Sequence, residues 1–422
     1  MKRTLLALWI IALLCRPLPS TATILLVKAD GTGQYPTIQA AVDAAVDGDE
    51  VHLVPGLFEG EGNREIDLQG KAITIRSQNL DASEVVVSSW IDSLTDVHAF
   101  VLGSGEGSDT VIEALTISGL YDPIYVDGGL INCVDSSPTI RDCVFYRNQG
   151  CSILGRGGHP LIQRCLFEDN DSYYGNSIVS AWAADMIDCQ FIENSMGDDG
   201  GGPCCAYVGT GMIAHCHFGG NRGFISAGAL CSNGAVVEDC TFFGNGYTLS
   251  AGAFAGSGTI RRCSFSGNIA FQEAGAALIT GTTTIENCDF TWNDSRVDGA
   301  AIAVTSGTLN LSNSIVAYNL QTYFDTPGPA VKLDGGTAVI TCTDIFANEC
   351  GDWEEGIADQ LGQSGNISAD PLYCQGIEGI YSNSPCAPAN SNGCGLIGLY
   401  DVACEPSSVE ARSWGKIKGL YR

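Results

Sequence analysis

Basic residues are scarce in this sequence. Its 422 residues include 20 Lys and Arg against 48 Asp and Glu, which gives a formal net charge of −28 at pH 7. A surface this acidic repels polyanions, so binding to nucleic acid is excluded as a function. Only 16% of the residues are charged and 45% are hydrophobic, which argues against disorder and allows a long buried core.

Long apolar runs are also lacking after the N-terminus. The run LLALWIIALL follows Lys2 and Arg3, and Ser20-Thr21-Ala22 completes a small-x-small cleavage pattern. Residues 1–22 are therefore interpreted as a signal peptide. No later run approaches the ~20 residues of a membrane-spanning helix. We therefore expect no transmembrane segment, and a protein that is secreted or held at the cell surface.

A short pattern, Cys-x-Phe-x-x-Asn, returns every 22 to 27 residues. A fixed period of this length indicates a repeat architecture. A degenerate copy follows from Ser314, and a stretched copy, CTDIFAN, from Cys342. The seven clear copies have their cysteines at Cys143, Cys165, Cys189, Cys216, Cys240, Cys263 and Cys288, and their asparagines at Asn148, Asn170, Asn194, Asn221, Asn245, Asn268 and Asn293.

An aliphatic residue or Met stands three positions before each of these cysteines. Cys and Phe, two apart, face the same side of a strand, whereas the residue three back is out of phase unless a bend lies between. The remainder of each unit is rich in Gly and Ala, which leaves little room for a helix. Short strands joined by bends, stacked coil on coil, predict an all-β fold: a parallel β-helix of about 9–12 coils.

Stacking in register places each repeated residue over its equivalent in the next coil. Phe then fills the core, and Asn tolerates a left-handed turn and passes amide hydrogen bonds between coils. Stacked cysteines have Cβ atoms ~4.8 Å apart, outside the ~3.5–4.5 Å range of disulfides. We therefore expect the seven repeat cysteines to remain buried free thiols.

Other cysteines fall outside this register. Cys374, Cys386, Cys394 and Cys404 lie in a Pro-, Asn- and Gly-rich segment, for which we expect two disulfides of open connectivity. Cys204 and Cys205 are adjacent, so one of them must point outward.

The residue before each repeat cysteine alternates in sign along the stack. This alternation predicts a structural charge ladder at one bend, which favours a structural over a catalytic role for His215. Its members are Asp142, Arg164, Asp188, His215, Asp239 and Arg262.

The segment from Gly31 places Ile38, Ala41, Val42 and Ala45 at helical spacing, which predicts a short helix capping the first coil. This opening, with KAITIRS from Lys71, resembles pectate-lyase-like right-handed parallel β-helix proteins, and GTGQYPTIQAAVDAA is similar to the opening of pectin methylesterases. NISADPLYC through SPCAPANSNGCGLIG resembles the closing coil and cap of bacterial proteins of that class. The resemblance implies a right-handed β-helix with its N-terminal cap over 23–372 and a Cys-rich cap over 373–405.

The catalytic signatures of the enzymes that share this fold do not carry over. Neither the pectin methylesterase Gly-Arg-Pro-Trp, nor the polygalacturonase Asn-Thr-Asp, nor the pectate lyase Arg-x-Pro-x-x-Arg occurs. The resemblance leaves a polysaccharide lyase or a glycoside hydrolase as the enzyme alternatives.

Two neighbouring coils hold the candidate contact residues. The aromatic residues Tyr173, Tyr174 and Trp182 lie close in sequence to the carboxylate of Asp185, a composition typical of sugar platforms; the alternative is an ordinary surface. Asp198 and Asp199, on a Gly-rich loop, suit a hard cation such as Ca²⁺ or an acid/base pair, the alternative being a solvated turn.

The leading hypothesis is an exported monomer that presents a rigid surface to extracellular polysaccharide or to a cell surface, without a catalytic set. The alternatives are the two enzyme classes above and an adhesin-like structural protein. No cofactor is expected apart from Ca²⁺ at the Asp pair. Residues 406–422 end in a basic stretch and are interpreted as an appended recognition tail.

Overall fold

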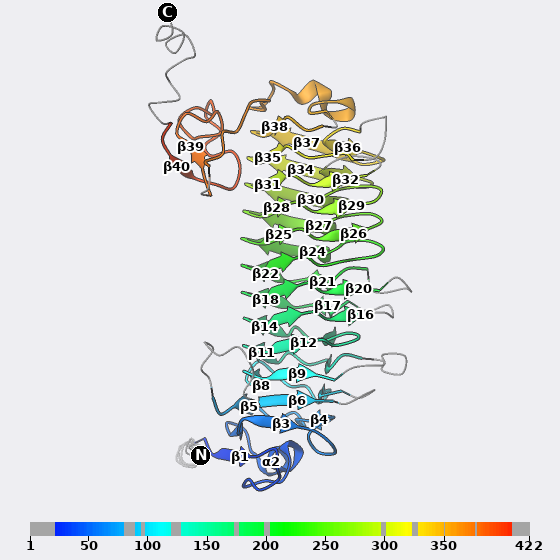
Figure 1. Cartoon of the computed structure of the whole chain (residues 1–422), viewed down its shortest axis with the longest axis vertical. Coiled ribbons are helices and arrows are strands. Elements are labelled where there is room, and N and C mark those ends of the chain that lie inside the picture. Colours follow the sequence, from blue (N-terminus) through cyan, green and yellow to red (C-terminus); the bar gives the residue numbers. More distant parts are fainter. Residues whose placement is uncertain are drawn as a thin grey trace, which may run out of the picture.

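The computed structural model describes residues 22–79, 89–93, 98–119, 128–172, 177–197, 203–296, 301–322, 328–349, 351–375 and 378–406. These residues form a parallel solenoid of about 14 turns, drawn as an upright column in Figure 1. The β-helix predicted from the repeat is confirmed. It has more turns than the recognisable repeats because the coils before Cys143 lack the Cys-x-Phe pattern. No helix in the described ranges is long and apolar enough to span a membrane.

A 12-stranded sheet takes one short strand from each of twelve coils. Its strands are β3 (Gly56–Phe58), β6 (Ser89–Asp92), β9 (Thr116–Ser118), β12 (Val144–Tyr146), β15 (Leu166–Glu168), β19 (Gln190–Ile192), β23 (His217–Gly219), β25 (Thr241–Phe243), β28 (Ser264–Ser266), β31 (Asp289–Thr291), β35 (Ile315–Ala317) and β38 (Asp344–Phe346).

A 21-stranded sheet forms two further sides of the coils. Its strands are β1 (Ile24–Val27), β2 (Glu50–Leu53), β4 (Ile66–Asp67), β5 (Thr74–Ser77), β7 (Phe100–Leu102), β8 (Val111–Glu113), β10 (Ile131–Val134), β11 (Thr139–Arg141), β13 (Ile153–Arg156), β14 (Leu161–Gln163), β17 (Val179–Ala183), β18 (Asp185–Ile187), β21 (Ala206–Thr210), β22 (Met212–Ala214), β24 (Leu230–Glu238), β27 (Phe254–Arg261), β30 (Ala277–Glu286), β33 (Ile302–Val304), β34 (Thr308–Ser312), β36 (Val331–Leu333) and β37 (Thr337–Thr341).

Three smaller sheets complete the strands of the described residues. They are β16 (Asp171–Ser172) with β20 (Ser195–Met196), β26 (Gly246–Thr248) with β29 (Ile269–Ala270) and β32 (Asp294–Ser295), and β39 (Ile380–Tyr381) with β40 (Val402–Cys404).

Two left-handed residues bound the short strand of each repeat. In the first clear copy they are Asp142, with φ 56°, and Arg147, with φ 52°. Each lies directly before a recurring residue of the repeat, the Cys or the Asn. In a straight strand, residues three apart face opposite sides. The first bend changes which side of the chain faces the core, so Ile140 and Cys143 are both fully buried.

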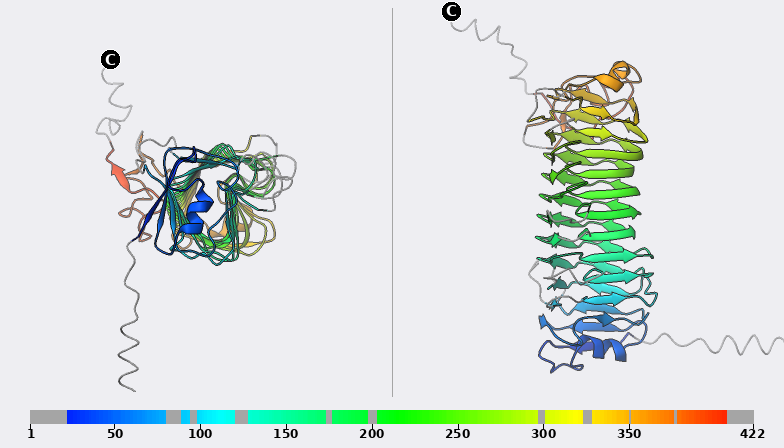
Figure 2. Two further views of the ribbon diagram at one scale, coloured as in Figure 1. Left: turned by 90° about the horizontal axis from the view of Figure 1, so that it is seen from below. Right: turned by 90° about the vertical axis from the view of Figure 1, so that its right-hand side faces the viewer.

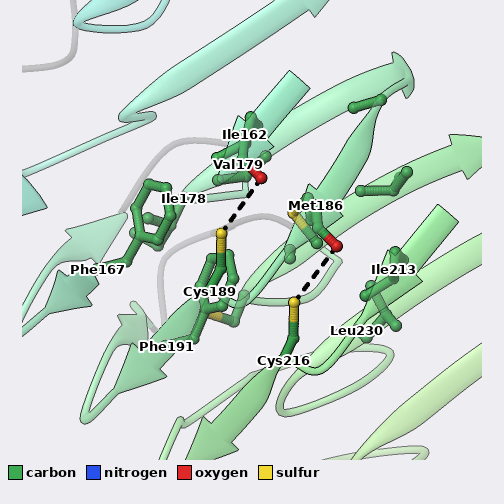
Figure 3. Packing of buried hydrophobic residues seen from close by; sticks show 14 of the residues in the cluster. Ile162, Phe167, Ile178, Val179, Met186, Cys189, Phe191, Ile213, Cys216 and Leu230 are labelled. Atoms are coloured by element: carbon green, nitrogen blue, oxygen red, sulfur yellow. Dashed lines mark hydrogen bonds between the residues drawn. The ribbon is translucent and has the colours of Figure 1, made fainter. Parts of the chain in front are cut away.

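Phenylalanine rings stack through the centre of the solenoid. The seven rings from Phe145 to Phe290 have centroids 4.5–4.9 Å apart and planes within 9° of parallel. Beside them the repeat cysteines are free and buried. Figure 3 shows the thiol of Cys189 directed at the carbonyl of Ile162, 3.5 Å away, in the preceding coil. The thiols therefore fill the core and donate weak hydrogen bonds to the backbone.

A ladder of buried asparagine side chains runs beside the phenylalanine stack. The Oδ1 atom of Asn170 accepts the backbone N–H of Asn148 at 3.0 Å and its side-chain N–H at 3.0 Å. The Nδ2 of Asn170 donates to the carbonyl of Phe145 at 2.9 Å. The same pattern continues to Asn348, beyond the seven predicted members. Buried amides that satisfy one another in this way hold the register of the coils.

A helix closes the N-terminal end of the stack. Helix α2 (Ile38–Ala44) begins after Thr37, whose side chain accepts the N–H of Ala40 as an N-cap. Its buried residues are Ile38, Ala41 and Val42, the positions that the helical spacing predicted. Figure 2 shows this helix lying across the open end of the first coil.

The other end of the stack is covered by residues 351–366, which include the short 3-10 helix η2 (Glu355–Gln360). Ile357 is fully buried there, and η2 contacts β36 and β37. Residues 371–406, called the C-terminal lobe below, fold back beside the column, as Figures 1 and 2 show. The Cys-rich segment thus covers the outer side of the last coils.

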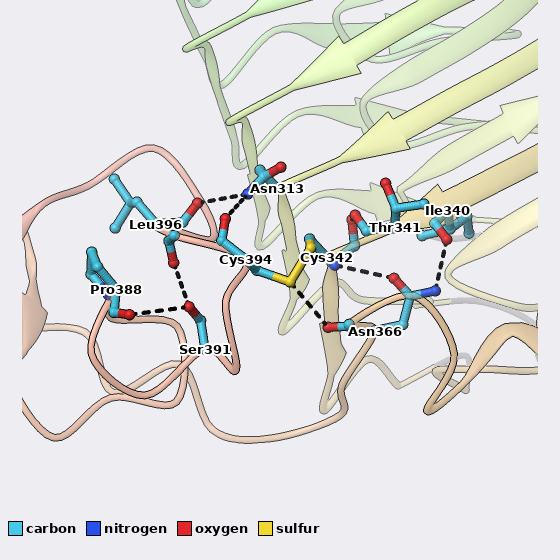
Figure 4. Close-up of a disulfide and its surroundings, with 12 residues drawn as sticks. Asn313, Ile340, Thr341, Cys342, Asn366, Pro388, Ser391, Cys394 and Leu396 are labelled. Atoms are coloured by element: carbon cyan, nitrogen blue, oxygen red, sulfur yellow. Dashed lines mark hydrogen bonds between the residues drawn. A yellow bond between two sulfur atoms is a disulfide. The ribbon is translucent and has the colours of Figure 1, made fainter.

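The lobe packs on the outer face of the 12-stranded sheet. Ile315 and Ala317 point outward from β35 and are nevertheless buried, in a cluster with Ile380, Cys386 and Ile397 of the lobe. At the edge of the sheet, Nδ2 of Asn313 donates to the carbonyls of Cys394 and Leu396, at 2.7 and 3.1 Å (Figure 4). Apolar and polar contacts together fix the lobe to the solenoid.

Disulfides add covalent links. Cys374 bonds to Cys404 within the lobe, as two of the four expected cysteines. Cys394 bonds to Cys342 of the solenoid, shown in Figure 4, and Cys386 is a buried free thiol. The expectation of two bridges among the four lobe cysteines was therefore wrong for one pair.

The register explains that error. β38 pairs with β35 through Asp344 and Ile315, so Thr343, not Cys342, occupies the core position of the repeat cysteine. The stretched copy is therefore a regular one that begins at Thr343. Cys342 takes the bend position, with φ 49°, where a side chain points outward and can reach the lobe.

The adjacent pair Cys204 and Cys205 divides between two clusters. Cys205 lies in the main core. Cys204 points away from it, as predicted for one of the two, but is buried in a second cluster and bonded to Cys231.

Candidate functional site

A pocket lies where the C-terminal lobe meets the 12-stranded sheet. Its volume is about 430 Å³, within the ~300–1,000 Å³ range of small-molecule sites. The lining residues are Ser266, Thr291, Trp292, Tyr373, Glu378, Gly379 and Tyr400. Three of these seven are aromatic, in a chain with 8% aromatic residues.

The solenoid supplies the floor of the pocket. Ser266 and Thr291 are paired residues of β28 and β31 that point outward from the sheet, next to the inward-facing phenylalanines. Trp292 follows at the second bend of its repeat, with φ 59°. Its side chain is 55% exposed and its ring stacks on Tyr318, with centroids 5.3 Å apart. A broad aromatic ring therefore stands at the edge of the pocket, supported from behind.

The lobe supplies the opposite wall. Tyr373 and Tyr400 pack edge to face, with ring centroids 6.3 Å apart. Gly379 lies between them along the wall, and a Cβ there would stand 2.3 Å from the Cβ of Ala403. The disulfide between Cys374 and Cys404 bonds two positions close in sequence to these aromatic residues. The disulfide therefore links the residue that follows Tyr373 to the end of β40.

A buried carboxylate joins wall and floor. Asp289, 1% exposed, accepts a hydrogen bond from the hydroxyl of Tyr373 at 2.8 Å and from the N–H of Leu399 at 2.9 Å. Burial raises the pKa of Asp289 to about 6, although both hydrogen bonds favour the charged form. Because both oxygens are engaged and covered, this carboxyl holds the lobe and does not reach a ligand.

A second buried carboxylate lies two coils further along the same column. Asp344 is fully buried and accepts the N–H of Ala369 at 3.0 Å, while its other oxygen lies 3.2 Å from the thiol of Cys386. Burial raises the pKa of Asp344 to about 7 and raises the pKa of the Cys386 thiol as well. Both carboxyl groups thus belong to the contact between lobe and solenoid.

The aromatic lining of the pocket suits contact with a sugar ring. Aromatic faces of this kind can pack against the apolar faces of sugar rings, while their hydroxyl and N–H groups remain available for hydrogen bonds. Glycoside hydrolysis uses two carboxyl groups that flank the scissile bond. Of the described lining residues, only Glu378 carries a carboxylate at the pocket.

The contact residues predicted from the sequence lie on another face. Trp182 stands on β17 of the 21-stranded sheet and is 67% exposed. Asp185 begins β18; its Oδ1 accepts the N–H of Met212 at 2.8 Å and lies 3.0 Å from Nε2 of His159. Tyr173 and Tyr174 lie outside the described residues. Sugar contact at Trp182 and Asp185 stays a prediction.

The predicted cation site, Asp198 and Asp199, also lies outside the described residues. Among the residues that the structure does describe, no group of three or more His, Cys, Asp or Glu side chains could hold a metal ion.

The predicted charge column is formed at both of its ends. Arg164 donates to Asp142 through Nε and an NH2 nitrogen, at 2.7 and 2.6 Å, and Arg262 donates to Asp239 at 2.8 and 2.9 Å. His215 occupies the expected bend, with φ 55°. Within the described part of the chain His215 makes no ion pair, so the column consists of two separate pairs.

Sequence reasoning missed the pocket, yet one local signal marked its side of the molecule. The bend column changes from charged residues to Asn287, Asn313 and Cys342, all of which the lobe contacts. This change indicates a covered surface.

Comparison with known proteins agrees with the coil geometry. Residues 129–268 match the family described as the right-handed β-helix region, so the handedness that the resemblance implied is confirmed. No curated protein matches the chain in sequence.

Several solved structures are similar in fold. The PL6 family alginate lyase AlyGC is 15% identical, with a TM-score of 0.48 over 90% of this chain, and this chain spans 58% of its length. XylC, solved with xylose, is 8% identical with a TM-score of 0.45, over 84% of this chain and 88% of its own. Pectate lyase Pel9A is 12% identical with a TM-score of 0.33, over 91% and 97%. Identities of this size concern the fold alone.

Proposed function

We propose that this protein is an exported β-helix protein that binds an extracellular glycan in the pocket between lobe and solenoid, without turning it over. The observation that carries the proposal is the pocket itself, with Trp292, Tyr373 and Tyr400 around a volume of about 430 Å³. Aromatic side chains offer large contact areas at a small cost in conformational entropy. Their backbones are fixed by the sheet below and by a disulfide beside the wall.

Export is supported by the disulfides. Cys342–Cys394 and Cys374–Cys404 hold the lobe that forms one wall of the pocket. Bonds of this kind persist in oxidising compartments and are rare in the cytosol. The signal peptide predicted over residues 1–22 agrees with such a location.

The test compares two exposed tryptophans. We expect a panel of plant and bacterial oligosaccharides to include one that binds the wild-type protein in titration calorimetry. Trp292→Ala should weaken that binding about tenfold or more, because buried aromatic contacts carry much of the energy of an interface. Trp182→Ala is the matched control, since this ring is also exposed but lies on a different sheet.

The same experiment separates the alternatives. Loss of binding in Trp182→Ala, with Trp292→Ala unaffected, would place the contact on the 21-stranded sheet and overturn the pocket. Release of shorter or unsaturated sugars from any polymer, with and without Ca²⁺, would show an enzyme. If no oligosaccharide binds and no product is released, the adhesin-like structural protein is the alternative that stands.

A further inference from the structure

The charge around the pocket restricts which glycan it can take. Between residues 263 and 406 the sequence holds 17 Asp and Glu against two basic residues, Arg296 and Lys332. The pocket is built entirely from this part of the chain. The ratio of acidic to basic residues is therefore higher around the pocket than in the protein as a whole.

Neither basic residue serves the pocket. Arg296 follows β32 and lies over the ring of Phe271, 4.5 Å from its centroid. Lys332 lies in β36 of the 21-stranded sheet. Arg262 lies in the same coil as the lining residue Ser266, at the bend before β28, and is held by the carboxylate of Asp239. No described lining residue is a cation that could receive a sugar carboxylate.

The acidic groups whose contacts involve the pocket residues or their neighbours are these. Glu378 lines the pocket and is exposed. Asp289, beneath it, accepts the hydroxyl of Tyr373 at 2.8 Å. Asp370 accepts the hydroxyl of Tyr318, the ring on which Trp292 stacks, at 2.9 Å. Asp401 is exposed and follows Tyr400 in the chain.

We propose that the pocket selects a glycan that carries amino groups instead of carboxylates. The proposal rests on the proposed function, because it names the charge class of the ligand bound at the same site. A sugar ammonium placed at Glu378 gains a charge-assisted hydrogen bond, while its ring packs against Trp292 or the tyrosines. A uronic acid in the same position brings a second carboxylate next to Glu378, with no cation to compensate it.

The whole-molecule field acts in the same direction. A net charge of −28 concentrates cationic polymers near the surface and repels polyuronates before they reach the pocket. The long-range part of this effect is screened by salt, whereas the contact at Glu378 is screened less. Selectivity should therefore fall, but persist, as the ionic strength rises.

The experiment titrates the full chain with four oligosaccharides of equal length: glucosamine, N-acetylglucosamine, glucose and galacturonate oligomers. It is carried out at mildly acidic pH, where amino groups are charged. We expect the glucosamine oligomer to bind at least about tenfold more tightly than the galacturonate oligomer. Glu378→Gln should remove most of that preference, measured as the ratio of the dissociation constants of the galacturonate and glucosamine oligomers. Glu193→Gln, an exposed carboxylate on a lower bend, is the matched control.

The outcomes distinguish this inference from the function on which it rests. If no oligomer binds, the proposed function fails and the inference with it. If oligomers bind but galacturonate binds as tightly as glucosamine, or Glu378→Gln leaves the preference unchanged, the charge selectivity is overturned and glycan binding stands.

Discussion

The lower and the upper coils of this solenoid share one core and differ on the outside. The asparagine ladder runs through both regions without a break, and the phenylalanine stack continues to Phe290, above which Val316 and Ile345 take the same core position. At the bend before the core residue, however, the lower coils carry the charged pairs Asp142–Arg164 and Asp239–Arg262, and the upper coils carry Asn287, Asn313 and Cys342.

The difference lies in what covers the bend. In the lower coils the bend faces solvent, and charges there interact with each other. In the upper coils the lobe covers it, and amides and a disulfide hold the lobe in place. The core-facing residues of a repeat determine how the coils stack, and its outward-facing residues determine whether another segment packs on that coil. Three changes would break or sharpen this contrast, and they are given from the largest effect to the smallest.

The disulfide between lobe and solenoid should give the largest effect. Cys342 and Cys394 are 52 residues apart in sequence, and closing a loop of this size typically contributes about 2–4 kcal/mol. Cys342→Ser/Cys394→Ser should therefore raise the rate of amide hydrogen exchange in the lobe while the lower coils stay protected. The lower coils serve as the internal control, since each coil contacts only its neighbours. Equal loss of protection in both regions would show that the lobe is part of the stack.

The buried carboxyl groups should give an intermediate effect that depends on pH. Burial raises the pKa of Asp289 to about 6 and that of Asp344 to about 7, from the ordinary value of 3.8. The docked lobe therefore holds protons that the released lobe loses, so docking is most stable below about pH 4 and weakens as pH rises to about 7.

The pH effect can be assigned to one residue. Other groups near these carboxyls are Tyr373, Tyr400, Cys386 and Asp370, and none of the tyrosines or the thiol should titrate below pH 7, since burial raises the pKa of each. In Asp344→Asn the amide oxygen can still accept the N–H of Ala369, so docking of the lobe is retained. Because an amide does not titrate, the part of the pH dependence that Asp344 contributes should disappear. Hydrogen exchange in the lobe from pH 4 to 7, corrected for the intrinsic rate, measures this; an unchanged slope in Asp344→Asn would contradict it.

Whether a contact could be predicted from the sequence depends on how far apart in the chain its two residues lie. The register of Phe145 over Phe167 and of Asn148 over Asn170 follows from a period, because each coil binds its neighbour. The contact of Asn287 with Leu396 joins residues 109 apart, and no periodicity records it. Thus the stack could be predicted, whereas the place of the lobe, and with it the pocket, could not.

One error had a different cause. The cysteine pattern starts the last repeat at Cys342. In the structure Thr343 occupies the core position instead, and its hydroxyl donates to the carbonyl of Thr341 at 2.9 Å. Serine does the same at Ser314, where the hydroxyl donates to Ser312 at 2.8 Å. This core position accepts any small side chain that can donate a hydrogen bond to a backbone carbonyl, whether a thiol or a hydroxyl. The presence of a cysteine alone therefore does not fix the register. The asparagine of the repeat would have done so, since Asn348 lies five positions after Thr343, the spacing of the regular copies.

The charge pairs of the lower coils should give the smallest effect. Arg164 is 44% exposed and Asp142 31% exposed, and their bidentate hydrogen bonds lie in solvent at the bend. Such pairs contribute about 0–1 kcal/mol, and salt screens them. Arg164→Gln should therefore lower the denaturation midpoint only slightly, and the difference from wild type should shrink in high salt. At Asn313, which occupies the same bend in the upper coils, Asn313→Ala removes two hydrogen bonds to partly buried carbonyls of the lobe and should cost about 1–2 kcal/mol, with little dependence on salt because these bonds join neutral groups. If the two substitutions had equal effects with equal salt dependence, the bend would play the same part in both regions, and the contrast between exposed and covered coils would be lost.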